Sequence, residues 1–175
     1  MEENIQKIKN AIRAVADFPK KGILFRDITT ALKDADILKL TVDELYEQFK
    51  DEKIDYIAGI ESRGFIYGMP LAYKMHCGFI PVRKPNKLPC ETISQEYELE
   101  YGTDKIEIHK DALKKTDRVL IVDDLLATGG TAAAAAKLIS KVADPVGIAF
   151  VIELSDLDGR KKLPSDIKVV SIVKY

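Results

Sequence analysis

Two adjacent carboxylates, Asp123 and Asp124, are followed by a run of small and hydroxyl side chains. They come directly after the apolar stretch 119–122, and the chain then reads Leu-Leu-Ala-Thr-Gly-Gly-Thr before an alanine-rich stretch, 132–140. The apolar stretch predicts a buried strand, and the alanines favour a helix. The pattern therefore predicts a strand, a tight loop and a helix.

The loop between this strand and this helix has the composition of a phosphate-binding site. Glycines let successive backbone N–H groups converge at a helix N-terminus, where the helix dipole favours an anion. We expect a phosphate to be bound by Ala127, Thr128, Gly129, Gly130 and Thr131, which we call the phosphate loop. Ligands of open α/β sheets bind at the carboxyl ends of strands, where Asp123 and Asp124 suit vicinal sugar hydroxyls. Together these residues describe a ribose 5-phosphate site.

The same pattern also fits a buried strand, an N-capping threonine and two solvated aspartates. Two other phosphate motifs, G-x-x-x-x-G-K-[ST] and G-x-G-x-x-G, do not occur after any predicted strand. The stretch 119–131 resembles the phosphoribosyl pyrophosphate signature of the type I phosphoribosyltransferases, and it is similar above all to that of the adenine phosphoribosyltransferases. This resemblance implies that Asp123, Asp124 and the phosphate loop bind the phosphoribosyl group.

Length and composition limit the alternatives. The chain has 175 residues, 46% of them hydrophobic and 31% charged, which suits a single globular domain. A net charge of -1 gives no general reason to bind nucleic acid or an anionic membrane. No apolar run approaches the roughly 18 residues of a membrane span, and no signal peptide is evident, so we expect a cytoplasmic protein. Cys77 and Cys90 lack zinc-site spacing, and we expect free thiols and no metal held by the protein alone.

The N-terminal part is predicted to contain a helix and a covering segment. Apolar residues recur at helical spacing over 3–15, whereas 18–27 is irregular and unusually rich in large apolar side chains. The latter resembles the F-P-x-x-G-I-x-F-R-D hood of the adenine phosphoribosyltransferases. This resemblance implies that the backbone at Leu24 and Arg26 recognises adenine and that Phe25 lies over the base. Phe25 could instead be a core residue.

An arginine follows the next predicted strand, 56–60. The chain there reads Glu-Ser-Arg-Gly-Phe and enters a helix predicted over 65–75. Arg63 would place a planar, permanently charged guanidinium at the mouth of the sheet, which suits a pair of pyrophosphate oxygens. A surface arginine at a strand end is the alternative. The stretch resembles the family loop [ED]-[SA]-R-G-F, which implies that Arg63 binds pyrophosphate.

Three further cations, Arg83, Lys84 and Lys87, follow the predicted strand 78–82. Such a run is commonly a solvated surface, but at this end of the sheet it would concentrate positive potential. It resembles the family motif R-K-x-x-K-L-P. The resemblance implies that these residues bind pyrophosphate or reach across the interface of a homodimer, with the subunit contact at residues 62–67 and near Arg83.

Residues 93–109 alternate in the manner of a β-hairpin around Gly102-Thr103-Asp104. Because the hairpin is long and has one acidic face, we expect a mobile lid, residues 91–109, rather than a member of the main sheet. It resembles the family's flexible loop Y-x-L-E-Y-G, which implies a catalytic role for Glu100 and a place in the lid for Tyr101. The alternative is that Glu100 is one of several solvated glutamates.

The remaining apolar periodicity predicts a helix over 37–49 and strands over 146–152 and 167–173. By resemblance, Leu154 contacts the base. We therefore expect one α/β domain with a central, mostly parallel sheet flanked by helices, the type I phosphoribosyltransferase fold. The lid (91–109) and a small hood, from about 18–30 and 153–164, would cover its ligand-binding edge.

The resemblance implies transfer of the 5-phosphoribosyl group from phosphoribosyl pyrophosphate to adenine, which gives AMP and pyrophosphate. Magnesium would enter with the phosphates of the donor, since it commonly keeps waters and substrate oxygens as ligands. A phosphoribosyltransferase for another base would keep the phosphate loop but change the hood. A purine-sensing regulator would need a DNA-binding module and a basic surface, which neither the length nor the charge provides.

Overall fold

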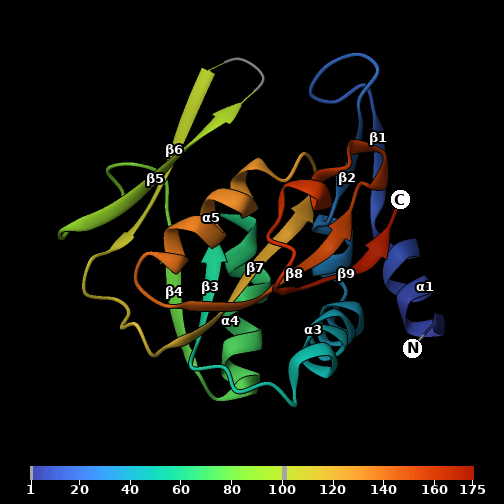
Figure 1. Ribbon diagram of the computed structural model, residues 1–175. Helices are drawn as coiled ribbons and strands as arrows, with labels where there is room; N and C mark the ends of the chain where they lie inside the picture. Colours follow the sequence, from blue (N-terminus) through green and yellow to red (C-terminus); the bar gives the residue numbers. More distant parts are fainter. Residues whose placement is uncertain (1, 100–101) are drawn as a thin grey trace.

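A five-stranded parallel sheet forms the centre of the protein in the computed structural model, which describes residues 2–99 and 102–175 (Figure 1). The strand order is β4-β3-β7-β8-β9, and every neighbouring pair is parallel. The strands are β3 (Tyr56–Ile60), β4 (Gly78–Val82), β7 (Arg118–Leu126), β8 (Asp144–Glu153) and β9 (Lys168–Lys174). The expected α/β fold with a central parallel sheet is confirmed.

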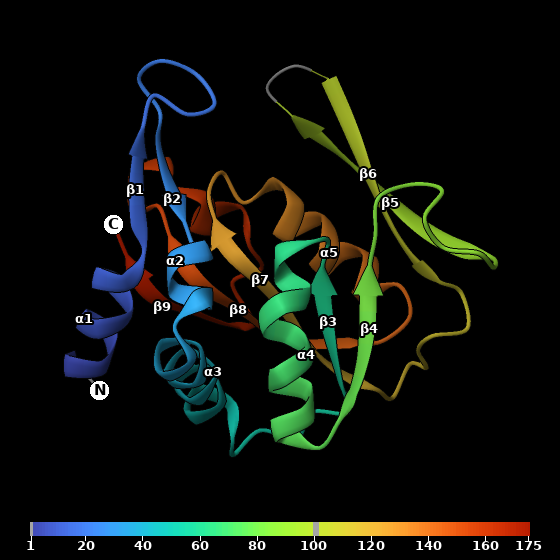
Figure 2. The ribbon, with the colours of Figure 1, turned by 180° about the vertical axis from the view of Figure 1, so that it is seen from behind.

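Helices cover both faces of this sheet (Figures 1 and 2). Successive residues of a strand point to opposite faces, and in β7 Ile121 joins one buried cluster while Val122 joins the other. The helix α5 (Gly130–Ser140) belongs to the first cluster. The second cluster is built with α1 (Glu2–Ala11), α2 (Thr29–Lys33), α3 (Ala35–Phe49) and α4 (Arg63–Met75). No helix in the described residues is long and apolar enough to cross a membrane.

Two antiparallel hairpins stand at the edge toward which β3, β7 and β8 point (Figure 1). One pairs β1 (Arg13–Ala16) with β2 (Leu24–Asp27), and the other pairs β5 (Thr92–Leu99) with β6 (Gly102–His109). Each is a separate two-stranded sheet. The edge where ligands of parallel sheets bind therefore lies between two projecting hairpins.

The N-terminal prediction was wrong in part. Helix α1 ends at Ala11 instead of continuing to residue 15, and Val15 lies in β1 opposite Phe25 of β2. Val15 is at helical spacing from the apolar residues of α1, but it lies in a strand, where a β-branched side chain packs well. The hood segment 18–27 is accordingly not irregular throughout, because its second half is a strand.

The C-terminal part of the hood is formed by two short 3-10 turns. They are η1 (Ser155–Leu157) and η2 (Gly159–Lys162), between β8 and β9. The guanidinium of Arg160 donates from Nε to Glu153 Oε1 over 3.0 Å and from Nη1 to the carbonyl of Val169 over 2.9 Å. These bonds fix η2 to the ends of β8 and β9.

The hairpin of residues 93–109 is confirmed, although its turn differs from the expected one. Leu99 pairs with Gly102, so Gly102, Thr103 and Asp104 belong to strand β6 and do not form the turn. In agreement with the predicted alternation, Glu96 and Glu98 are exposed, whereas Tyr97 packs against the core. The mobility expected of this lid stays a prediction.

Candidate functional site

The two aspartates lie inside β7 and not after it, which corrects the predicted strand end. Strand β7 continues to Leu126, and Asp123 pairs with Phe150 of β8. Its pairing with β3, however, stops at Val122. One side of β7 is therefore free of a neighbouring strand at the two aspartates, which opens the sheet edge to a ligand.

Helix α4 begins against this open side of β7. A Cβ atom at Gly64 would lie 2.6 Å from the carbonyl oxygen of Val122, so only glycine allows this approach. The approach brings Arg63, the first helical residue, to Asp124: Arg63 Nε lies 3.0 Å from Asp124 Oδ2. The predicted pyrophosphate-binding arginine and the predicted ribose-binding carboxylate are thus in direct contact.

The paired carboxylates carry raised pKa values. Burial and the adjacent Asp124 carboxylate raise the pKa of Asp123 well above its usual value. Burial also raises the pKa of Asp124, against the opposing effect of Arg63. Asp123 Oδ1 accepts a hydrogen bond of 2.8 Å from the Asp124 backbone N–H, whereas the buried Asp124 Oδ2 has no hydrogen-bond donor of good geometry among the described residues. A ligand that donates hydrogen bonds or carries positive charge would satisfy this oxygen.

The phosphate loop surrounds a small cavity of about 90 Å³, whose lining includes all five of its residues together with Asp123. Gly129 has φ +79, a left-handed conformation that favours glycine, and α5 begins at the next residue. No side chain caps the N-terminus of α5. The first N–H groups of a helix have no partner within it, so those of α5 are available to an anion.

A second glycine supports this loop from the hood. A Cβ atom at Gly159 would lie 2.0 Å from the carbonyl oxygen of Ala127, and one at Gly129 would lie 2.2 Å from the carbonyl oxygen of Gly159. The phosphate loop and η2 thus meet backbone to backbone. Because Arg160 fixes η2 to the sheet, this contact sets the position of the phosphate loop.

The three cations after β4 gather around Glu61, at the end of β3. Its carboxylate accepts hydrogen bonds from Arg83 Nε over 3.1 Å, from the Lys84 backbone N–H over 2.8 Å and from Lys87 Nζ over 2.5 Å. Burial acts to raise the pKa of Glu61, but these three donors outweigh it and lower the pKa to about 2. Glu61 therefore stays ionised and fixes the basic segment beside the sheet edge.

The side chain of Lys84 points elsewhere, to the lid hairpin. It forms an ion pair with Asp104 and donates a hydrogen bond of 2.9 Å to the hydroxyl of Tyr97. Each predicted pyrophosphate-binding cation, Arg63 included, thus contacts a carboxylate of the protein itself.

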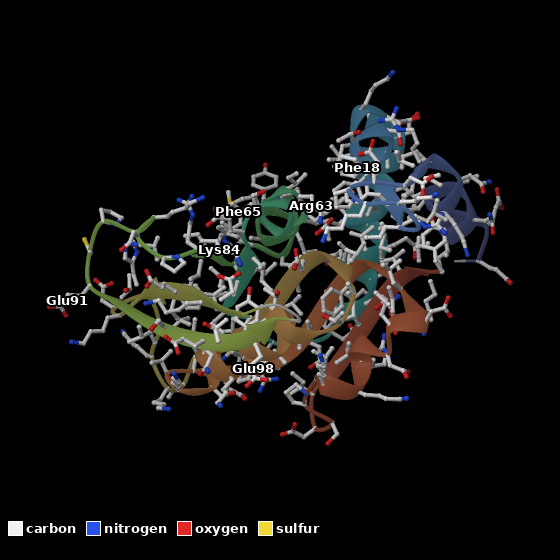
Figure 3. All side chains as sticks on the ribbon, turned by 90° about the horizontal axis from the view of Figure 1, so that it is seen from above. Phe18, Arg63, Phe65, Lys84, Glu91 and Glu98 are labelled. Carbon is white, nitrogen blue, oxygen red and sulfur yellow. The ribbon has the colours of Figure 1, made fainter. Side chains whose placement is uncertain are left out.

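An apolar cavity of about 400 Å³ lies beside the hood, lined by Val15, Phe18, Phe25, Asp27, Ile28, Thr29 and Arg63. The guanidinium carbon of Arg63 is 5.7 Å from the centre of the Phe25 ring. Seen from above, Arg63 lies between Phe18 of the hood and Phe65 of α4 (Figure 3). The cavity could take a flat apolar ring next to the two aspartates.

The other predicted base-binding residues have different surroundings. The guanidinium of Arg26 stacks 3.6 Å from the centre of the Tyr175 ring, and Leu24 is about half exposed. Leu154 packs against the core cluster of α1–α4 and donates its backbone N–H to Leu126 over 2.9 Å. Only the backbone of Leu24 and Arg26 is expected to face the base, so these side-chain positions are compatible with that prediction.

Two predicted residues, the catalytic Glu100 and the lid residue Tyr101, lie outside the described residues. Conversely, no separate role was predicted for Glu61, Gly159 or Tyr97. The position of Glu61 two residues before Arg63 was a usable signal, because a carboxylate at a strand end beside a basic segment suggests a shared ion pair. The contacts of Gly159 and Tyr97 depend on tertiary packing, and no local pattern announces them.

As far as the structure describes the chain, the site offers oxygen atoms but no complete metal site of its own. Within the part of the chain that the structure describes, no group of three or more His, Cys, Asp or Glu side chains could hold a metal ion. The carboxylates of Asp123 and Asp124 suit a hard cation such as Mg²⁺, which takes oxygen ligands and readily shares them with phosphates. Cys77 and Cys90 are free, as expected.

Comparisons with known proteins agree with this geometry. The family model of the phosphoribosyl transferase domain matches residues 29–174. An adenine phosphoribosyltransferase of Cyanothece sp. is 60% identical over 169 residues, which cover 96% of this chain and 99% of that protein.

Solved structures show the same similarity. The adenine phosphoribosyltransferase of Thermoanaerobacter pseudethanolicus has a TM-score of 0.94 at 53% identity, with 98% of this chain and 99% of that chain covered. The enzyme of Saccharomyces cerevisiae, in complex with adenine and an imino-altritol bisphosphate, has a TM-score of 0.93 at 41% identity, with 99% and 100% covered.

The support of the phosphate loop by Gly159 gives a testable prediction. Gly159→Ala would place a methyl group against the Ala127 carbonyl, and such overpacking costs about 1 to 3 kcal/mol. We expect the Kd of ribose 5-phosphate to rise by about 5-fold to 150-fold. Pyrophosphate binding, which we predict to rely on other elements, should change little. Isothermal titration with each ligand measures both, and Asp156→Ala in the exposed η1 turn is the control. Unchanged binding of ribose 5-phosphate, or equal loss of both ligands, would contradict this role.

Proposed function

Because the chain belongs to the adenine phosphoribosyltransferases, we propose that it transfers the 5-phosphoribosyl group of phosphoribosyl pyrophosphate to adenine. The products are AMP and pyrophosphate, and the reaction is one of purine salvage. The observation that carries this proposal is that Asp123 lines the phosphate-loop cavity, while Asp124 contacts Arg63, which lines the apolar cavity. That order matches the order of phosphate, ribose and base in the product.

In the proposed complex the phosphate loop binds the 5-phosphate of the donor. The N–H groups at the start of α5 and the hydroxyls of Thr128 and Thr131 would donate to its oxygens. The carboxylates of Asp123 and Asp124 would accept hydrogen bonds from the ribose hydroxyls. The contact between Gly159 and the loop supports this proposal, since it fixes the loop at one distance from the aspartates.

We propose that Arg63, Arg83, Lys84 and Lys87 bind the pyrophosphate group. Departure of pyrophosphate leaves negative charge on its oxygens, and cations placed beforehand lower the energy of that step. The bonds of Glu61 support the proposal because they fix Arg83 and Lys87 without ligand. Arg63 would have to share its guanidinium between Asp124 and the ligand.

Magnesium is proposed to enter with the donor, held by donor oxygens and, through Asp123 and Asp124, by the protein. A bound magnesium ion would offset the negative charge of the pyrophosphate group as it leaves. Asp124 Oδ2, which accepts no hydrogen bond of good geometry from the described residues, supports this arrangement. On this basis, turnover should stop in excess chelator and return with added magnesium.

Adenine is proposed to lie in the cavity beside Phe25, with its edge recognised by the backbone of Leu24 and Arg26 and its other side near Leu154. Stacking on the Phe25 ring and contact with Arg63 would hold the ring plane. The hood would also limit water near the activated sugar, which could otherwise be hydrolysed.

The choice of base gives a prediction that tests the function directly. Hypoxanthine carries an oxygen where adenine has its amino group, so a backbone carbonyl that accepts from adenine would face another acceptor, at a cost of about 1 to 3 kcal/mol or more. We expect kcat/KM to be at least about 5-fold lower for hypoxanthine and guanine. The test is product analysis with phosphoribosyl pyrophosphate and each of adenine, hypoxanthine, guanine, xanthine and uracil. Equal kcat/KM for adenine and hypoxanthine would favour the second candidate, a phosphoribosyltransferase for another base.

Glu100 is proposed as the catalytic residue of the lid, on the Leu-Glu-Tyr-Gly match in the sequence alone, with Tyr101 beside it. Rupture of the bond to pyrophosphate develops positive charge on the ribose, and the attacking nitrogen of adenine must lose a proton. A carboxylate can assist both changes. We expect Glu100→Gln to lower kcat by about 10² to 10⁴, the range of general acid-base groups, with little effect on donor affinity. Glu96→Gln and Glu98→Gln are the matched controls, and equal small losses in all three variants would contradict the assignment.

A homodimer is also proposed, and helix α4 offers a surface for it. Ile66, Met69 and Tyr73 recur at helical spacing on α4 and are 40%, 51% and 90% exposed. They continue the expected contact of residues 62–67, although Tyr67 itself is buried in the core. An apolar stripe of this kind is typical of an interface between subunits.

The cytoplasmic location stays a prediction.

The dimer proposal is tested by placing a charge in this stripe. We expect Met69→Lys to shift the protein to a monomer in sedimentation experiments, because a lysine ammonium would be buried in an apolar contact. Leu157→Lys, which also charges an exposed apolar residue, is the control and should leave the oligomeric state unchanged. An active monomeric wild type at the assay concentration would rule the proposal out.

A further inference from the structure

The hydroxyl of Tyr97 in the lid hairpin joins Lys84 and Thr131, two residues of the proposed site for phosphoribosyl pyrophosphate. It accepts a hydrogen bond of 2.9 Å from Lys84 Nζ and one of 3.3 Å from Thr131 Oγ1, and it donates one of 3.0 Å to Asp104 Oδ2. Lys84 and Asp104 also form an ion pair. Lys84 and Thr131 come from separate elements, the segment after β4 and the start of α5. The hairpin residues Tyr97 and Asp104 thus close a network across the site.

These contacts use the same donors that the substrate needs. In the proposed complex the hydroxyl of Thr131 donates to the 5-phosphate, and the ammonium of Lys84 donates to pyrophosphate. In the structure, both donate to the hairpin. A threonine hydroxyl has one hydrogen to donate, so Thr131 cannot donate to Tyr97 and to a phosphate at the same time.

The hairpin lies where it can occupy the hydrogen-bond donors at the start of α5. The position of a Cβ atom on Gly130 would lie 3.7 Å from Cδ2 of Tyr97 and 3.6 Å from the carbonyl oxygen of Glu98, which is van der Waals contact. The hairpin therefore lies over the start of the phosphate loop helix α5. In Figure 3, Lys84 lies between α4 and the hairpin.

The pairing of Lys84 differs in kind from that of its neighbours. Arg83 and Lys87 pair with Glu61, which directly follows β3 of the central sheet, whereas Asp104 belongs to a separate two-stranded sheet. This hairpin is joined to the β4 end by the bridge of Arg83 with Glu107. Asp104 thus lies outside the central sheet, on the part of β6 beyond the bridge at Glu107. The Lys84 ammonium beside it also lowers the pKa of Asp104, so the carboxylate is charged at neutral pH.

We propose that Tyr97 and Asp104 set the affinity for phosphoribosyl pyrophosphate. Their oxygens accept the hydrogen bonds of Thr131 and Lys84 in place of the phosphate oxygens of the substrate. This inference rests on the proposed function, since it takes the 5-phosphate and pyrophosphate as the ligands of those two residues. When phosphoribosyl pyrophosphate binds, a phosphate oxygen replaces the oxygen of Tyr97 or Asp104 as the hydrogen-bond acceptor. The exchange releases the hairpin from the phosphate loop at the moment when the lid must rearrange over the substrate.

The two halves of the network predict two separate effects. Asp104→Asn removes the charge that holds Lys84, so the Kd of pyrophosphate should fall by about 3-fold to 10-fold, since hydrogen bonds to charged groups are the stronger ones. Tyr97→Phe frees the hydroxyl of Thr131, so the Kd of ribose 5-phosphate should fall by about 2-fold to 5-fold.

The experiment is isothermal titration of ribose 5-phosphate and of magnesium pyrophosphate, each alone, into the full-length protein. Glu96→Gln is the matched control for Asp104→Asn, because it removes one carboxylate from an exposed face of the same hairpin. Tyr46→Phe on α3 is the control for the loss of a tyrosine hydroxyl. Melting temperatures of all four variants should stay close to that of the wild type.

Tighter pyrophosphate binding in Asp104→Asn and tighter ribose 5-phosphate binding in Tyr97→Phe, with neither change in the controls, would support the inference. Weaker or unchanged binding in these variants would overturn it and would make both residues supports of the site instead. An equal gain in Glu96→Gln would also overturn it, since general electrostatics would then explain the effect. A wild type that binds neither ligand would overturn the proposed function together with this inference.

Discussion

The close approach of helix α4 to strand β7 at Gly64 is the contact on which the site depends. With no side chain at this position, the start of the helix lies against the Val122 carbonyl, and Arg63 reaches Asp124. A larger residue would lift the helix and leave the buried Asp124 carboxylate without a cation, which is a costly state. The glycine therefore permits a pair of aspartates to exist inside a strand. The end of β3 pairing at Val122 then leaves one side of β7 open beside the same pair.

The cations of a site for a polyanion repel one another, just as its carboxylates do. The protein resolves this with its own carboxylates: Asp124 for Arg63, Glu61 for Arg83 and Lys87, and Asp104 for Lys84. Local neutrality of this kind accords with a chain whose net charge is only -1. Positive potential then becomes available to a ligand only as these pairs are shared or broken, so the affinity for an anion reflects the strength of the internal pairs as well as the number of cations.

Much of the fold was predictable because the central strands are short, apolar and bounded by polar loops. The predicted bounds of β3 and β4 agree with the structure, and the run of cations after β4 lies at the expected sheet edge. Errors arose where local spacing competed with pairing between distant residues. Val15 has helical spacing but pairs with Phe25, and the aspartates remain in β7 because β8 continues beside them. Neither the contact of Gly159 with Ala127 nor the hydrogen bonds of Tyr97 could be read from the sequence, since both join segments brought together only by the complete fold.

The elements around the site differ in how firmly they are held, and this difference has a consequence for the chemistry. The phosphate loop is fixed by backbone contact with η2, and η2 is fixed by Arg160 to Glu153 and Val169, so the 5-phosphate would bind at a constant place. Among the described residues, the lid hairpin forms its own two-stranded sheet and is joined to the end of β4 by the bridge of Glu107 with Arg83. Its polar link to the site, through Tyr97, ends on groups that a phosphate can take over. A rigid support for the unreactive end of a substrate lets binding energy be used at the reacting centre, while a movable cover can admit the substrate and then exclude water. Rigidity at the phosphate and exchangeable contacts at the lid are thus complementary requirements of a single group-transfer reaction.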